Sequence, residues 1–195
     1  HNRTHSFPTR RSSDLIEITL NEGFPTEPAK FGPGDRAQLS FQLRDLDIRL
    51  PAMMEHILLT ADDAQHAGNL EKIRLAADLG HAVVPDQPPV LETVVGGKPA
   101  QWDELKEPMA ARLADWARVA AEADQTIAIK AHVSSAAHLP EHILWLLGQV
   151  RSRHIRAVYD YSHFQLQGLD MRSTLRDLLP ETVFVHVKDA KGTPQ

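Results

Sequence analysis

The chain has 195 residues, of which 42% are hydrophobic and 24% are charged, a composition typical of a soluble globular protein rather than of a disordered one. Its formal net charge of -5 provides no basic excess, so nucleic acid is not the expected partner and a small polar ligand fits better. Cysteine is absent, which excludes disulfides and thiolate metal sites and favours a reducing cytoplasm. No apolar run approaches the length of a membrane span.

The first fifteen residues are unlike the rest of the chain. Residues 1–15 resemble a translated sequencing-library adapter, so we expect a non-native leader there and exclude it from the fold argument. The alternative is a short basic targeting segment, because Arg3, Arg10 and Arg11 lie among serines and threonines. This stretch has no apolar face that would bind a membrane or a receptor, which favours the adapter. The natural start is then missing, and the domain covers residues 16–195.

Strand and helix patterns alternate from residue 16 onward. Alternating apolar and polar residues predict a first strand at 16–20, and a loop rich in glycine and proline follows at 21–34. A helix is expected at 35–45, and residues 48–59 begin as a strand and continue as a loop.

The middle of the chain carries the clearest helical signals. The Thr60 hydroxyl is expected to cap a helix that ends at Gly80, and a strand at 88–95 is followed by a glycine turn. Residues 103–122 show the most regular helical periodicity, which predicts a long helix with its apolar stripe packed on a sheet.

The last three predicted strands each end in titratable side chains, at Lys130, Asp160 and His186. Helices are predicted between them, around Leu146 and Leu178. Apolar runs that stop at polar residues are typical of parallel strands in an α/β barrel, whose active site lies at the carboxyl ends of the strands. We therefore expect an α/β fold, a partial (β/α)8 TIM barrel with about six βα units, because a closed barrel needs eight units in about 250 residues. A complete open doubly wound sheet is the structural alternative.

Three of these polar residues indicate a metal site. Asp160 and His163 lie three positions apart, so an oxygen and a nitrogen can face one cation. The alternative is that Asp160 only caps a helix and His163 lies on a loop. His186 favours the metal, because it places a polar ring in an otherwise buried strand pattern at the next strand end. The candidate ligands are Asp160, His163 and His186, and the divalent ion would be Mn, Co, Zn or Mg.

Two motifs resemble a known family. The segments YDYSHF at 159–164 and VHVKD at 185–189 are similar to those of the sugar phosphate isomerase/epimerase family, with a xylose isomerase-like TIM barrel. The resemblance covers residues 15–195. It implies that Asp160 and His186 bind a divalent metal with His163 beside them. It also implies one glutamate ligand on an earlier strand and another on the last strand, beyond Gln195.

Lys130 departs from this pattern, because it stands where the earlier glutamate is expected. A lysine can supply positive charge near carboxylates, or act as a base if burial lowers its pKa, but an ammonium does not bind a metal. The alternative is a structural ion pair inside the barrel with Glu92 of the neighbouring strand. The sequence supports a functional role of Lys130 and a structural ion pair equally.

The remaining candidates lie near strand ends. Lys130, His132 and Glu92 are the candidate catalytic residues. His163, Lys188 and His56 are the candidate substrate-binding residues, with Lys188 and His132 placed to hold a sugar oxygen or a phosphate. The other internal histidines are expected at the surface; they are His66, His81, His138, His142 and His154.

The leading functional hypothesis is a metal-dependent isomerase or epimerase that acts on a sugar or sugar phosphate through an enediolate. By resemblance, the metal would hold adjacent carbonyl and hydroxyl oxygens of a ketose while a carboxylate moves a proton between carbons. One alternative is a barrel that binds a carbohydrate without turning it over, and another is an endonuclease-like metal phosphodiesterase. The expected partner is a small sugar, with a homo-oligomer possible and no nucleic acid or membrane. The fragment itself is expected to be inactive and to aggregate.

Overall fold

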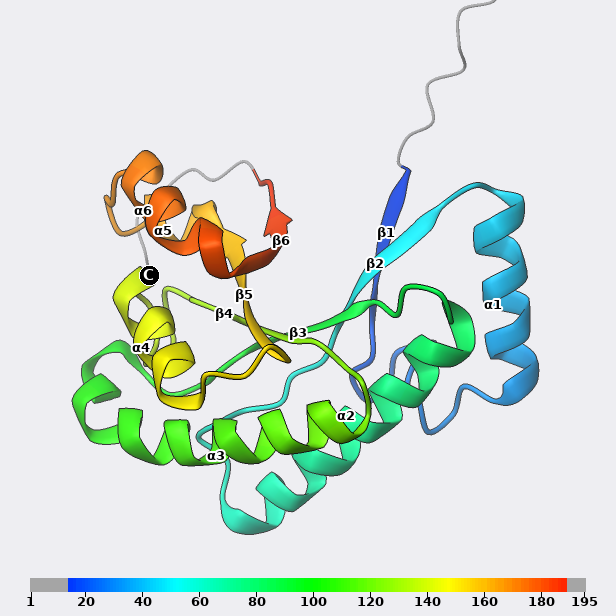
Figure 1. Ribbon diagram of the computed structural model, residues 1–195, viewed down its shortest axis with the longest axis horizontal. Coiled ribbons are helices and arrows are strands. Elements are labelled where there is room, and N and C mark those ends of the chain that lie inside the picture. The colour runs from blue at the N-terminus through cyan, green and yellow to red at the C-terminus, as the bar shows by residue number, and fades with distance from the viewer. Residues whose placement is uncertain (1–13, 189–195) are drawn as a thin grey trace, which may run out of the picture.

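The apolar runs of the sequence form one sheet of six parallel strands in the computed structural model, which describes residues 14–188 (Figure 1). Each strand pairs with the strand that follows it in the chain, so their order across the sheet is β1-β2-β3-β4-β5-β6. The strands are β1 (Leu15–Thr19), β2 (Arg49–Met54), β3 (Val90–Val94), β4 (Ile127–Lys130), β5 (Ile155–Asp160) and β6 (Thr182–His186).

This strand order decides between the two architectures that the sequence left open. A doubly wound sheet reverses its strand order at a switch point, whereas a barrel adds each strand beside the previous one. The two outermost strands also approach one another, because His186 of β6 lies 3.0 Å from Glu17 of β1. The sheet is therefore curled into an open half-barrel, and the predicted partial (β/α)8 barrel is confirmed.

Helices connect the strands and cover the outside of the sheet (Figure 1). They are α1 (Pro33–Asp45), α2 (Asp63–Val83), α3 (Trp102–Glu122), α4 (Pro140–Val150), α5 (Tyr161–Gln165) and α6 (Met171–Leu178), with short 3₁₀ turns at Pro99–Gln101 and Leu179–Glu181. The short helix α5, directly after β5, was not predicted.

The predicted start of α2 was wrong by two residues. Asp62, not Thr60, is the N-cap, and its carboxylate accepts a hydrogen bond from the Gln65 backbone N–H at 2.8 Å. The Gln65 side chain accepts in return from the Asp62 N–H. This reciprocal pair is a capping box, which satisfies two backbone donors that helical bonding leaves free. The helix also continues past Gly80 to Val83.

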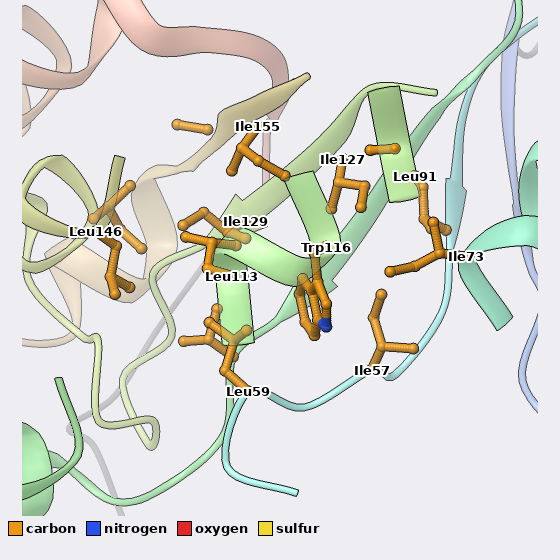
Figure 2. Close-up of a cluster of buried hydrophobic side chains, with 14 of the residues drawn as sticks. Ile57, Leu59, Ile73, Leu91, Leu113, Trp116, Ile127, Ile129, Leu146 and Ile155 are labelled. Carbon is orange, nitrogen blue, oxygen red and sulfur yellow. The ribbon is translucent and has the colours of Figure 1, made fainter. Parts of the chain in front are cut away.

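The hydrophobic core lies between the sheet and the helices. Strand residues such as Leu91, Ile127 and Ile129 point outward and pack against Leu113 and Trp116 of α3, all of them fully buried (Figure 2). Successive side chains of a strand point to opposite faces, so the residues between these point into the half-barrel. The helix stripe predicted from the sequence is thus core, and charged residues such as Glu92 and Lys130 lie on the inner face.

None of the helices in residues 14–188 has the length and hydropathy needed to span a membrane. Most of the predicted leader lies outside the described residues, and its last residue, Leu15, begins β1. Asp189 of the second motif also lies outside them.

Candidate active site

Five charged or titratable side chains from five strands meet on the inner face of the half-barrel. The parallel register aligns Asp160 of β5 with His186 of β6, at the edge where the strands end. The five strand residues are Glu17, Glu92, Lys130, Asp160 and His186. Together with Lys188, just past β6, they form what we call the charge cluster. The structure brings Lys130, Asp160 and His186, which the sequence places at strand ends, close together at this edge.

Lys130 and Glu92 form a buried ion pair. The Lys130 Nζ donates to Glu92 Oε1 at 2.8 Å, and the two side chains are 9% and 1% exposed. This is the pairing that the sequence offered as one of two interpretations of Lys130. Burial raises the pKa of Glu92, and the Lys130 ammonium opposes that rise.

His186 is the centre of the charge cluster. Its Nε2 lies 3.0 Å from Glu17 Oε2 and 3.4 Å from Glu92 Oε2, and its Nδ1 lies 3.4 Å from Asp160 Oδ2. The interactions with Asp160 and Glu17 raise the pKa of His186 to about 9, so the ring is an imidazolium at neutral pH when no metal is bound.

Asp160 is held by several donors. Its carboxylate accepts from the Ser162 hydroxyl at 2.6 Å, from the Ser162 backbone N–H as the N-cap of α5, and from Lys188 Nζ at 2.5 Å. Burial alone would raise the pKa of Asp160, but the bonds from His186, Lys188 and Ser162 hold it far below its ordinary value. The residue therefore caps a helix and also carries a fixed negative charge in the site.

Two neutral histidines lie beside Asp160. The rings of His132 and His163 have centroids 4.1 Å apart, and His163 Nε2 lies 3.5 Å from Asp160 Oδ2. Burial lowers the pKa of both rings, and their proximity lowers it further for His163, to about 4. At neutral pH these two imidazoles can accept protons, unlike that of His186.

Other candidates lie apart from the charge cluster. His56 is exposed, and its backbone N–H donates to Asn21. Its neighbour Glu55 is buried and pairs with Lys72 of α2 on the outside of the sheet. The expected surface position was wrong for His142 and His154, which are 8% and 9% exposed.

Glu17, Glu92 and His186 could hold a metal ion. Each offers one ligand atom, and these three atoms lie within 4.8 Å of one another. Two of the carboxylate oxygens, Glu17 Oε1 and Glu92 Oε2, are buried without a hydrogen-bond partner among the described residues. Two carboxylates and an imidazole suit Zn or Mn, and such unsatisfied buried oxygens fit a bound cation.

The sequence analysis missed Glu17. Its signal was the alternation of Ile16, Glu17 and Ile18 in the first strand, which puts Glu17 on the face opposite the two isoleucines. Such an acid is usually solvent-facing, and only the curl of the sheet brings it to His186. Asp160 and His186, predicted as ligands with His163, do lie together, but His163 contacts Asp160 rather than His186.

Comparisons with known proteins agree with this fold. Residues 13–195 match the family described as xylose isomerase-like TIM barrel. A comparison with curated proteins finds no match.

Solved structures of similar fold include three informative relatives. The probable 3-DHS dehydratase AsbF of Bacillus anthracis is 18% identical with a TM-score of 0.75, and the alignment covers 92% of this chain and 64% of that one. A D-tagatose 3-epimerase-like protein is 16% identical with a TM-score of 0.72, covering 93% and 69%. The IOLI protein with a bound zinc atom is 15% identical with a TM-score of 0.74, covering 93% and 65%.

These identities establish the fold alone, and the chain spans about two thirds of the length of these relatives. The family match covers nearly the whole chain, and the six-stranded half-barrel is the architecture which that match implies. The chain belongs to the xylose isomerase-like TIM barrel family.

Proposed function

We propose that the whole protein is an isomerase or epimerase that acts on a sugar or sugar phosphate through an enediolate. The observation that carries this proposal is the charge cluster, in which three carboxylates and three basic side chains converge at the carboxyl ends of the strands. Fixed charges in a site shielded from water stabilise the charge that develops when a carbon next to a carbonyl loses its proton. The family includes epimerases and dehydratases, which supports chemistry of this kind.

The chain's own residues can divide this work. His163 is neutral at pH 7 and lies at the rim, so it is placed to take a proton from a substrate carbon or hydroxyl. Lys188 is half-exposed and can bind a substrate oxygen or phosphate while it remains close to Asp160. His132 shares this rim through its contact with His163.

A divalent ion, Mn, Co, Zn or Mg, fits the same site. Glu17, Glu92 and His186 would hold it, with Asp160 on the other side of the His186 ring. When bound, the ion would polarise the substrate carbonyl and stabilise the negative charge on its oxygen. The zinc in the IOLI structure supports a metal in this fold.

A second function is favoured by the Lys130–Glu92 ion pair. An ammonium that already neutralises a buried carboxylate leaves less negative charge for a metal, so the barrel would bind a carbohydrate without turning it over. Sugar binding with no bound metal and no turnover in the whole protein would support this second function.

The proposed reaction is tested by assaying the whole protein on ketoses and ketose phosphates with each divalent ion. We expect activity that depends on the ion and falls at least about 100-fold in Asp160→Ala and in His186→Ala, since each removes a charge from the site. Asp177→Ala, on an exposed position of α6, is the matched control and should retain activity. Unchanged activity in both site variants would refute the proposal.

A further inference from the structure

We infer that Lys130 is a built-in competitor for the metal site, and that a divalent ion binds at Glu17, Glu92 and His186 only when the Lys130 ammonium leaves Glu92. This inference rests on the metal site of the proposed function but not on any reaction at that site. It concerns the occupancy of the site, which can be measured without a substrate.

The contacts of Lys130 carry the argument. Its Nζ lies 2.8 Å from Glu92 Oε1 and 3.5 Å from His186 Nδ1, so it touches two of the three candidate ligands. Both Lys130 and Glu92 are buried, so water screens their interaction poorly. The ammonium thus places a positive charge within the coordination region of an incoming cation.

The donor set explains why the two cations exclude each other. Glu92 offers Oε1 to Lys130, while its Oε2 has no hydrogen-bond partner among the described residues and points with Glu17 Oε2 toward His186 Nε2. A divalent ion bound there would stand next to an ammonium on the same carboxylate. Like charges at this separation in a buried site repel strongly, so the ion must displace the ammonium.

The long aliphatic stem of lysine makes that displacement feasible. Lys130 is the last residue of β4, and Asp160 is the last residue of the adjacent strand β5, with both side chains close to His186 Nδ1. An ammonium released from Glu92 would find carboxylate partners near this rim. The site therefore has two states, one closed by Lys130 and one occupied by metal.

The test is a titration of Mn²⁺ into the 195-residue chain, carried on a soluble fusion partner that binds no Mn²⁺, with free Mn²⁺ counted by electron paramagnetic resonance. We expect Lys130→Met to bind Mn²⁺ at least tenfold more tightly than the unsubstituted chain. Lys130→Arg, which keeps the positive charge, should show no such gain. Glu92→Gln added to Lys130→Met should abolish the gain.

Lys72→Met is the matched control, because Lys72 also pairs with a buried carboxylate, Glu55, but outside the metal site. It should leave Mn²⁺ affinity within twofold of the unsubstituted value. If Lys130→Met does not unfold cooperatively on heating, Lys130→Gln replaces it in the titration, because a glutamine can still hydrogen-bond Glu92. Equal or weaker binding in the neutral Lys130 variants, including no binding at all, would overturn the inference. Loss of isomerase activity alone would not affect this result, because no sugar is present.

Discussion

At the scale of single residues, burial sets the protonation state of histidines that look alike in the sequence. The ring of His142 in α4 stacks on Trp102, with centroids 4.0 Å apart, and its Nδ1 has no hydrogen-bond partner among the described residues. Burial lowers the pKa of His142 to about 4, with a further lowering from His138 that Glu141 and Asp103 oppose. A neutral ring is therefore part of the packing between α3 and α4.

This predicts a pH-dependent contribution to stability from His142. Its folded pKa of about 4 is below its ordinary value of 6.5, so the contribution is complete above pH 6.5 and is lost as the pH falls toward 4. His142→Phe keeps a ring on Trp102 without a titrating group, and should lose less free energy of unfolding between pH 7 and pH 5. Urea unfolding at the two pH values measures this. His56→Ala, at an exposed position, should lose as much free energy of unfolding between the two pH values as the unsubstituted chain does. If His142→Phe also lost that much, His142 would not be the source of the pH dependence.

The sequence revealed the site residues that lie at strand ends and Glu92 in the middle of β3, but it did not reveal Glu17 in the middle of β1. Lys130, Asp160 and His186 stop apolar runs, so the pattern itself identified them. Glu17 could not be found in this way, because its role depends on a contact 169 positions away in the chain. The Lys130–Glu92 pair was foreseeable, because adjacent parallel strands bring their inner-face residues together.

At the scale of single elements, the start of α2 shows how a local signal can be misassigned. Thr60 and Asp62 are both N-cap residue types, and only Asp62 has the Gln65 side chain three positions later that completes the capping box. The short helix α5 was missed for a different reason. It has five residues, fewer than hydrophobic periodicity needs to become visible.

The capping assignment predicts different costs at the two positions. Asp62→Ala should lower the free energy of unfolding by about 1 kcal/mol, because it leaves the Gln65 N–H without its side-chain acceptor. Thr60→Ala should cost less than Asp62→Ala, because Asp62 rather than Thr60 caps the helix. Chemical denaturation of both variants makes the comparison, and a larger loss in Thr60→Ala would contradict the assignment.

At the scale of the whole molecule, the half-barrel leaves apolar surface at its outermost strands. On β6 and just past it, Val183, Val185 and Val187 are 42%, 46% and 83% exposed, while His186 between them points inward. Among the described strands, β1 and β6 each pair on one side only. Exposed apolar edge strands promote aggregation through intermolecular pairing.

We therefore expect the 195-residue chain to aggregate through β6. The double substitution Val185→Lys and Val187→Lys should slow aggregation, because charge on an edge strand disfavours pairing with another chain. Light scattering at fixed protein concentration gives the rates. Leu58→Lys, which adds charge at a position 38% exposed and outside the strands, is the matched control. Equal rates for the double variant and the unsubstituted chain would contradict a role for β6.

The whole fold was predictable because its signals are local and repeated. Each strand and long helix has its own periodic pattern, and their strict alternation implies parallel neighbours. The curl of the sheet was not contained in any one segment. It arises from the twist of all six strands together, and it decides which side chains meet across the inner face.

Removal of a proton from carbon at this inner face can be detected by incubating the whole protein with a ketose in D₂O and following the substrate by NMR. We predict deuterium at the carbon next to the carbonyl, at a rate that falls at least about 100-fold in Asp160→Ala. Exchange precedes net conversion, so it would be detected even where the stereochemical outcome is unknown. Binding of sugars without any exchange, across a panel of ketoses and ketose phosphates with each divalent ion, would rule out proton removal from carbon and favour a carbohydrate-binding barrel.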